Sequence, residues 1–217
     1  MGYTQKQHYP ITEQPTLLSY RLAGSIHKTA LDDLLKKRNL KIEKLNVEIL
    51  KLPRHKRQEI HGRELFLIHG EHALAIDRIL HQGADGPYHL MDPVIRKSVL
   101  DSWKFLHEQK VIFLIAICVM GNHVHVIVRA PDGTDEVDPG KLLQRHKRFT
   151  ARDANLLLKK TNQPFWDGAY DDRTIRAGKF ITAMWYVLNN PVKAGLVENW
   201  KDWPGTFVNP EYVGLFK

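Results

Sequence analysis

The chain contains a single cysteine, Cys118, among its 217 residues. One cysteine excludes a disulfide within the chain, and it also excludes the multi-cysteine zinc and iron–sulfur sites. The neighbours of Cys118 in 111–120 are apolar, so we expect a buried, unreactive thiol rather than a nucleophile.

Long apolar runs are also missing. The longest, 111–120, has the length of a strand, whereas a membrane-spanning helix needs roughly 18 consecutive apolar residues. Residues 1–15 are polar and lack the apolar stretch of a secretory signal. The sequence therefore predicts a cytoplasmic protein without a membrane partner.

Acidic residues are fewer than basic ones: the chain has 24 Asp and Glu against 32 Lys and Arg, which gives a net charge of +8. This excess suits a polyanionic partner, either nucleic acid or an anionic membrane surface, although many basic proteins bind neither. Apolar residues make up 43% of the chain and charged residues 26%, which is typical of a folded protein. The length fits one domain, or a small domain with an insertion.

The hydrophobic spacing predicts both strands and helices. Strand-like runs lie at 17–25, 111–120 and 123–129, and Gly121-Asn122 between the last two indicates a hairpin or a kinked strand. Helical spacing is found at 28–52, at 65–80, from Pro93 onward, at 140–160 and at 174–189. We expect Asp92 and Asp138 to cap two of these helices, and Pro53 and Pro191 to end two others.

Basic residues concentrate in two segments. The segment 36–57 carries nine basic residues against two acids, and we interpret it as a solvated helix face rather than a phosphate-binding rim. The segment 141–160 carries seven against one, interleaved with Phe149 and Thr150, and is the better candidate for binding nucleic acid. Its candidate DNA-binding residues are Lys141, Arg145, Lys147, Arg148 and Arg152.

Two histidines flank one valine in Asn122-His123-Val124-His125. On a strand, residues two apart face the same side, so both imidazoles would lie together as half of a divalent-metal site. Taken alone, the pattern is more common among surface or hydrogen-bonded histidines, because nothing in it completes a coordination sphere.

Near the end of the last predicted helix, Tyr186 precedes Asn190 by four residues. On a helix this spacing places both on one face, about 6 Å apart along the axis. A phenolic hydroxyl can act as a nucleophile, and an amide oxygen can bind a metal. By themselves, a core tyrosine and an asparagine cap are the more common interpretation, and Pro191 biases Asn190 away from helical backbone.

Taken together, these motifs resemble those of the REP-associated tyrosine transposases, relatives of the small single-strand DNA transposases in the HUH nuclease superfamily. Residues 120–128 are similar to the family's Met-Pro-Asn-His-Val-His motif, with Gly121 in the place of proline. Residues 185–197 resemble its Tyr-(Ile/Val)-x-x-Asn-Pro-Val-(Arg/Lys)-Ala-Gly-Leu-Val signature. Weaker agreement extends the resemblance from about Leu17 to Pro204.

The resemblance implies an α+β fold with a ferredoxin-like core, in which helices pack on a central antiparallel sheet. It also implies that the chain, 1–217, is a single transposase-like HUH nuclease domain with a helical insertion at 28–82. By the same resemblance, His123, His125 and Asn190 would bind Mg²⁺ or Mn²⁺, and Tyr186 would be the nucleophile.

The implied activity is metal-dependent cleavage and rejoining of single-stranded DNA at palindromic, REP-type hairpins, through a 5′-phosphotyrosine intermediate. Such an endonuclease and strand transferase acts in DNA transposition and recombination. Two other functions stay open: a domesticated, catalytically weak protein that binds DNA hairpins, and a metal-dependent hydrolase that uses water as its nucleophile. The chain would be a monomer or a homodimer, and in a dimer Tyr186 would be able to serve the partner's histidines. Phe165 and Trp166 are candidates for base stacking, although core positions are more common for such residues.

Overall fold

The computed structural model describes residues 8–82 and 86–216, which divide into two compact units. The larger unit consists of 8–25 and 87–216, and the smaller one of 26–82 and 86. Among the described residues, no helix combines the length and the apolar character needed to cross a membrane.

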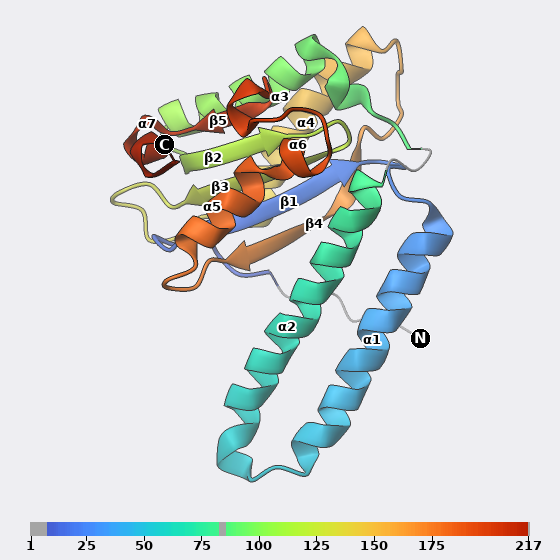
Figure 1. The fold of residues 1–217 in the computed structure, drawn as a ribbon, viewed down its shortest axis with the longest axis vertical. Helices are drawn as coiled ribbons and strands as arrows, with labels where there is room; N and C mark the ends of the chain where they lie inside the picture. The colour runs from blue at the N-terminus through green and yellow to red at the C-terminus, as the bar shows by residue number, and fades with distance from the viewer. Residues whose placement is uncertain (1–7, 83–85, 217) are drawn as a thin grey trace. The chain divides into compact units, whose positions relative to one another are not determined.

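The larger unit is built on a five-stranded antiparallel sheet in the order β4-β1-β3-β2-β5 (Figure 1). The strands are β1 (Thr16–Leu22), β2 (Phe113–Val119), β3 (His123–Arg129), β4 (Trp166–Thr174) and β5 (Thr206–Val208). The central strand, β3, places His125 opposite Ser19 of β1 and opposite Cys118 of β2. The two histidines of β3 therefore lie in the interior of the sheet rather than at an edge.

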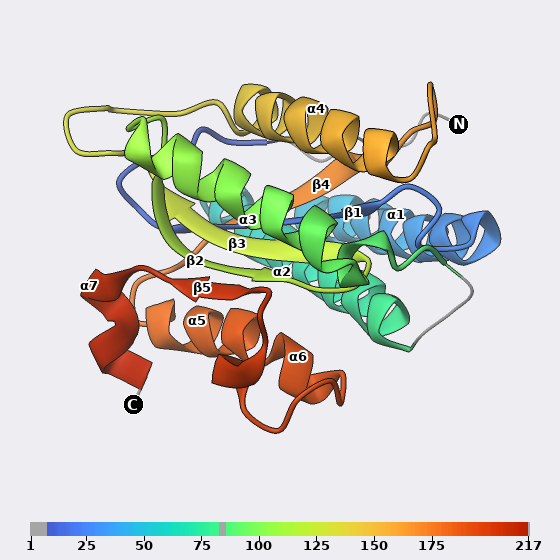
Figure 2. The same cartoon turned by 90° about the horizontal axis from the view of Figure 1, so that it is seen from above.

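Helices cover both faces of this sheet (Figure 2). One face carries α3 (Pro93–Glu108) and α4 (Pro139–Leu157), and the other carries α5 (Phe180–Leu188), α6 (Asn190–Lys193) and α7 (Pro210–Val213). The 3₁₀ turns are η1 (His89–Met91), η2 (Trp200–Asp202) and η3 (Gly214–Phe216). The α+β class expected from the sequence is confirmed.

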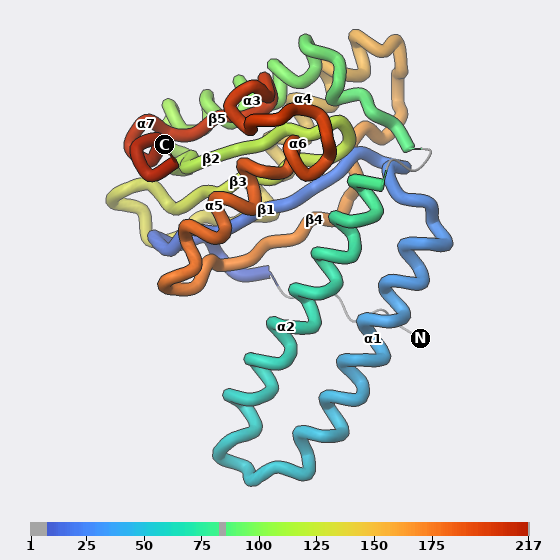
Figure 3. The backbone as a smooth tube through the Cα atoms, in the orientation of Figure 1, coloured from blue at the N-terminus to red at the C-terminus, as the bar shows by residue number. Residues whose placement is uncertain are grey.

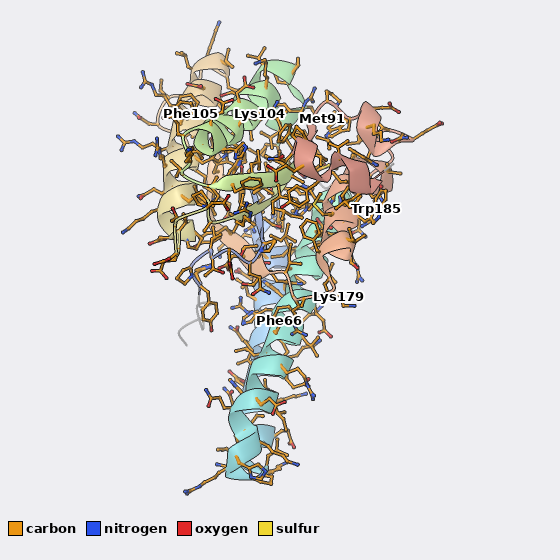
Figure 4. The ribbon with its side chains drawn as sticks, turned by 90° about the vertical axis from the view of Figure 1, so that its left-hand side faces the viewer. Phe66, Met91, Lys104, Phe105, Lys179 and Trp185 are labelled. Carbon is orange, nitrogen blue, oxygen red and sulfur yellow. The ribbon has the colours of Figure 1, made fainter. Side chains whose placement is uncertain are left out.

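Alternation along β3 decides which side chains meet which helices. Val124 and Val126 belong to the apolar cluster under α3 and α4, whereas Ile127 belongs to the cluster under α5. Because side chains alternate along a strand, His123 and His125 share the face of Ile127. Figure 4 shows the two helical layers at opposite sides of the sheet, with Phe105 on α3 and Trp185 on α5.

The smaller unit is a helical hairpin of α1 (Lys28–Leu50) and α2 (Arg54–His81), whose connection is easily followed in Figure 3. Arg57 closes the end of α1, because its guanidinium donates to the carbonyls of Leu50 at 2.7 Å and Leu52 at 2.9 Å. Across the hairpin, Lys41 pairs with Glu71. Both helices lie where the helical insertion was expected, and the single-domain organisation of the chain stays a prediction.

The expected helix caps are confirmed. The Asp92 carboxylate accepts hydrogen bonds from the amides of Val94 at 2.8 Å and Ile95 at 3.2 Å, and Asp138 accepts one from Lys141 at 3.0 Å.

Cys118 is fully buried, and burial raises the pKa of its thiol to about 12, which agrees with the unreactive cysteine that the sequence predicts.

Three expectations about element boundaries were wrong. The helix expected at 65–80 begins earlier, at Arg54, and the one expected at 174–189 begins only at Phe180, because Thr174 ends β4. Pro191 does not end a helix. It occupies the first turn of α6, where its missing N–H is no loss, while α5 has already ended at Leu188.

Candidate active site on the α5 face of the sheet

The two histidines follow a tight turn, Gly121-Asn122, between β2 and β3. A Cβ atom added to Gly121 would lie 2.7 Å from Cδ1 of Tyr88 and 3.1 Å from Cγ of Met91. These two side chains pack over the turn, which explains why a glycine stands where the family motif has proline. The Asn122 carbonyl accepts a hydrogen bond from the Leu22 amide at 2.9 Å, so the turn is also tied to the end of β1.

His123 and His125 are both buried, and their ring centroids lie 4.8 Å apart. The side-chain oxygen of Asn122 accepts a hydrogen bond from Nδ1 of His123 at 2.6 Å, so this nitrogen carries the proton. Nδ1 of His125 lies 2.7 Å from the Ser19 hydroxyl. Hydrogen bonds at Nδ1 fix the orientation of an imidazole and favour metal binding through Nε2. The predicted placement of both rings on one face is confirmed.

Helix α5 brings Tyr186 to this pair. Its ring centroid lies 5.3 Å from that of His125, with the ring planes at 70°. Tyr186 is half-buried, so its ring is fixed against β3 while part of its surface stays accessible. A strand and a helix that are far apart in the sequence thus bring an imidazole and a phenol together within one chain.

Asn190 joins the same group. Its side-chain amide donates to the Tyr186 carbonyl at 2.7 Å, which satisfies an acceptor at the end of α5. The residue is completely buried, and its Oδ1 finds no hydrogen-bond donor in the part of the chain that the structure describes. A buried acceptor left unsatisfied costs about 1–3 kcal/mol. A cation at this oxygen would remove that cost, so the donor set of two imidazoles and one amide oxygen fits a divalent metal.

Lys193 is a further residue at this site to which the sequence assigned no role. Its Nζ lies 4.8 Å from the centroid of the Tyr186 ring. The break between α5 and α6 places this cation over a ring seven residues earlier in the chain. Its place in the Arg/Lys position of the signature was the available signal, but only the fold shows which side chain the cation accompanies.

The predicted DNA-binding residues lie elsewhere. All five are on α4, which covers the face of the sheet opposite to α5 (Figure 2). The structure therefore does not bring them together with His123, His125, Tyr186 and Asn190. Four of the five are exposed and form no ion pair with any residue of 8–82 or 86–216; these are Lys141, Arg145, Arg148 and Arg152.

Lys147 is different from these four because it is used inside the fold. Its ammonium donates to the carbonyls of Asp167 at 2.8 Å and Ala169 at 3.3 Å, and it lies over the rings of Tyr20 and Tyr170. Burial lowers the pKa of this ammonium to about 8. Lys147 thus ties the start of β4 to α4.

The two aromatic candidates for base stacking are core residues. Phe165 is 5% exposed and Trp166 is 7% exposed, and both belong to the apolar cluster beneath α3 and α4. The indole of Trp166 also donates to the Thr150 hydroxyl at 2.9 Å. The core interpretation of both residues is therefore confirmed.

Among solved structures, the chain is similar to a REP-associated tyrosine transposase bound to a REP hairpin. The two are 15% identical with a TM-score of 0.51, and the match covers 94% of this chain and 81% of the other. A protein assigned as a transposase from Deinococcus radiodurans is 12% identical with a TM-score of 0.40, over 88% of this chain and 98% of the other. No family model and no curated protein matches the sequence. The resemblance predicted from the motifs is thus confirmed at the level of architecture: the chain has the fold of a REP-associated tyrosine transposase.

Proposed function

We propose that this protein is a transposase-like enzyme that cleaves and rejoins single-stranded DNA at palindromic, REP-type hairpins, with Tyr186 as its nucleophile. The observation that carries the proposal is the contact between two motifs: the ring of Tyr186 lies 5.3 Å from that of His125 within one chain. The similar fold of a transposase bound to a REP hairpin supports a DNA hairpin as the partner.

In this proposal, His123, His125 and Asn190 hold a divalent metal, Mg²⁺ or Mn²⁺. The unsatisfied, buried Oδ1 of Asn190 beside the histidine pair supports this assignment. A metal bound there would supply positive charge to the scissile phosphate. Asn122 and Ser19 act behind the two rings, since each contacts an Nδ1 and so holds an imidazole in place.

The chemistry at Tyr186 exchanges one phosphate ester for another. The phenolic oxygen forms a bond to phosphorus as the bond between phosphorus and the 3′ oxygen breaks. The phenol loses its proton, and the departing oxygen takes one up to become a free 3′-hydroxyl. Because the 5′-phosphotyrosine keeps the energy of the ester, attack by a 3′-hydroxyl rejoins the strand by the reverse path without ATP. Lys193, over the ring, would add positive charge beside the incoming phosphate.

The exposed cations of α4 would bind a different part of the DNA. Since α4 and α5 cover opposite faces of the sheet, Lys141, Arg145 and Arg152 cannot contact the phosphate that Tyr186 attacks. We therefore assign these three residues, together with Arg148 and Lys147, to the DNA backbone away from the cleaved bond.

A covalent adduct assay tests the nucleophile. Wild-type protein incubated with Mn²⁺ and a labelled oligonucleotide, a hairpin with single-stranded flanks, should form a protein–DNA adduct that survives denaturing electrophoresis. Tyr186→Phe should abolish the adduct while hairpin affinity stays within about tenfold, since the substitution removes only a hydroxyl. Tyr212→Phe, another half-buried tyrosine that packs against the same apolar cluster, is the matched control and should leave the adduct unchanged.

The other outcomes separate the alternatives. An undiminished adduct with Tyr186→Phe would refute the assignment of the nucleophile. Hairpin binding without any adduct in the wild type would favour a domesticated binding protein. Cleavage that does not depend on Tyr186 would favour a metal-dependent hydrolase.

A further inference from the structure

Arg21 of β1 points to the face of the sheet that carries the candidate active site. Its neighbours Tyr20 and Leu22 belong to the apolar cluster under α3 and α4, so alternation along the strand directs Arg21 to the other face. In the pairing of β1 with β3, Arg21 stands directly opposite His123. Side chains at directly opposite positions of an antiparallel pair are neighbours, so the Arg21 side chain begins beside one of the two histidines.

The Arg21 side chain is only 9% exposed, and one carboxylate balances its charge. Nη2 donates to Oδ2 of Asp167 at 2.7 Å. Among the residues that the structure describes, the Arg21 side chain forms this single hydrogen bond. A guanidinium carries five N–H donors in a planar fork, so most of these donors are left for an anion.

Asp167 lies at an irregular step of the edge strand β4. The pairing of β1 with β4 is regular up to Tyr20 and then shifts register, so that 167–169 bulge opposite Arg21. The Oδ1 atom of Asp167 accepts a hydrogen bond from the Ala169 amide at 2.8 Å. Because both carboxylate oxygens are engaged, the bulge holds the Arg21 guanidinium in one orientation.

The bulge is open to solvent. Gly168 and Ala169 are exposed. A Cβ atom added to Gly168 would meet no atom within 4 Å apart from those of its chain neighbours, so a ligand can approach the backbone closely here. Since β1 lies between β4 and β3 in the sheet, Arg21 stands between this open edge and the histidine pair.

The charge at the bulge is positive. Besides Arg21, Lys147 contributes a cation, because its ammonium donates to the Asp167 carbonyl at 2.8 Å. Asp171, the next acid along β4, is itself paired with Arg173 at 3.9 Å. Two cations around one carboxylate favour the binding of an anion such as phosphate.

Stability alone does not account for the ion pair between Arg21 and Asp167. Removing a guanidinium from water costs free energy that a buried ion pair does not reliably return. Apolar residues of similar size would join the two strands at least as well. A charge kept at this position, beside the histidine pair and next to an open edge, therefore indicates a function in binding.

We propose that Arg21 binds a phosphate of the DNA, the one adjacent to the phosphate that Tyr186 attacks, and that Asp167 orients the guanidinium for this contact. The proposal rests on the proposed function and adds a contact with the substrate that neither motif contains. Arg21 reaches from β1 toward β4 and away from β3, so the guanidinium would meet the neighbouring phosphate of the strand rather than the attacked one.

A methylphosphonate scan tests this contact. In a methylphosphonate linkage, a neutral methyl group replaces one charged oxygen of the phosphate. Hairpin oligonucleotides with this change at one linkage at a time are titrated against the wild type and against Arg21→Gln, in EDTA so that binding is measured without cleavage. With unmodified DNA, the substitution should weaken binding by roughly 10- to 100-fold, as the loss of a charge-assisted contact predicts. With the neutral linkage at the contacted position, it should change affinity by less than about twofold.

A double variant separates this contact from a structural role. Arg21→Gln/Asp167→Asn removes both charges of the pair, so that no carboxylate is left unpaired, and tryptophan fluorescence should show that it folds. We expect it to lose affinity with the same dependence on the methylphosphonate position as Arg21→Gln. Binding at wild-type affinity by this double variant would show that the ion pair serves only the fold, and would overturn the proposal.

Arg129→Gln is the matched control. Arg129 also lies on a strand of the sheet and is paired with an aspartate, Asp132, at 2.7 Å. It stands at the opposite end of β3 from His123. Its replacement should change hairpin affinity by less than about twofold at every linkage.

Failure of this inference is distinguishable from failure of the proposed function. The length of the released DNA fragment identifies the cleaved bond. If the adduct with Tyr186 forms but coupling with Arg21 appears at no linkage adjacent to that bond, Arg21 does not bind this phosphate and the proposed function stands. Coupling only at a distant linkage, or only at the attacked one, would overturn the proposal in the same way. If the wild type binds no hairpin, both fail.

Discussion

On each face of the sheet, a buried histidine contacts a hydroxyl group: His146 on the α3 and α4 side, and His125 on the α5 side. The two differ in what their second ring nitrogen contacts. On the α3 and α4 side, His146 has both ring nitrogens at hydroxyls: Nε2 lies 2.7 Å from Tyr20 and Nδ1 lies 2.9 Å from Ser102. On the α5 side, His125 contacts Ser19 through Nδ1, and its ring lies against Tyr186. His146 is therefore part of the packing, whereas His125 belongs to the candidate active site.

The hydrogen bonds around His146 also define its protonation. The Trp103 indole donates to the Tyr20 oxygen at 2.9 Å, so the Tyr20 hydroxyl donates its own proton to Nε2 of His146. That leaves Nδ1–H to donate to Ser102, and the ring is neutral. Burial, reinforced by the charge of Lys147, lowers the pKa of His146 to about 3. A histidine with both nitrogens committed in this way cannot bind a metal, so burial alone does not distinguish a ligand from a structural residue.

The largest expected effect in this comparison is that of His125→Ala. Removal of one metal ligand should reduce formation of the covalent adduct by at least about 10²- to 10³-fold, and raised Mn²⁺ should not restore it. His146→Gln is the control on the other face, and the folded variant should form the adduct at the wild-type rate. Full activity of the wild type in EDTA would contradict the metal assignment, and loss of the adduct only in His146→Gln would reverse the roles of the two faces.

A smaller effect concerns stability against pH. Between the unfolded-state pKa of about 6.5 and the native value of about 3, the unfolded chain binds a proton at His146 that the native chain does not bind. His146 should therefore reduce the free energy of unfolding by about 1.4 kcal/mol for each unit by which the pH falls below 6.5. In His146→Gln this contribution should disappear, so that the variant loses less stability on acidification than the wild type.

Urea unfolding at several pH values between 7.5 and 4.5 measures this difference. Tryptophan fluorescence reports on the larger unit, because all five tryptophans of the chain lie in it. His55→Gln, at an exposed position of α2, is the control and should follow the wild type. Equal pH dependence in His146→Gln and the wild type would show that His146 takes up a proton in the native state.

The same contrast explains how far the sequence predicted the structure. The grouping of residues on the α5 face could be predicted, because short motifs specify it. Two histidines share a face of β3 by alternation, and the four-residue spacing brings Asn190 to the Tyr186 carbonyl even though α5 ends at Leu188. β4 was missed because 166–174 is mostly polar and shows no apolar alternation, so only its pairing with β1 makes it a strand.

The basic helix α4 shows a second limit of prediction from the sequence. Its charge and its Asp138 cap could be predicted, but not the face of the sheet that it covers, because chain connections and not local spacing decide that. A count of charges also does not reveal which cations are engaged within the protein and which are left to bind DNA. In 36–57, Lys51 pairs with Glu48, Lys41 pairs with Glu71 and Arg57 binds carbonyls, whereas on α4 Lys147 is the cation committed to backbone carbonyls.

The smallest expected effect tests whether the exposed cations of α4 bind DNA at all. Replacing Lys141, Arg145 and Arg152 by glutamine should make the dependence of the hairpin binding constant on salt shallower by about 2 on a log–log plot, since each lost contact with single-stranded phosphate contributes about 0.7. Lys36, Lys37 and Lys44 are equally exposed on α1, and their replacement by glutamine is the matched control, with an expected change below about 0.7. Equal slopes in the two triple variants would mean that the hairpin responds to total charge and not to the α4 face. A shallower slope in the α4 variant with an unchanged adduct yield at saturating DNA would instead establish that one face of the sheet holds the DNA while the other cuts it.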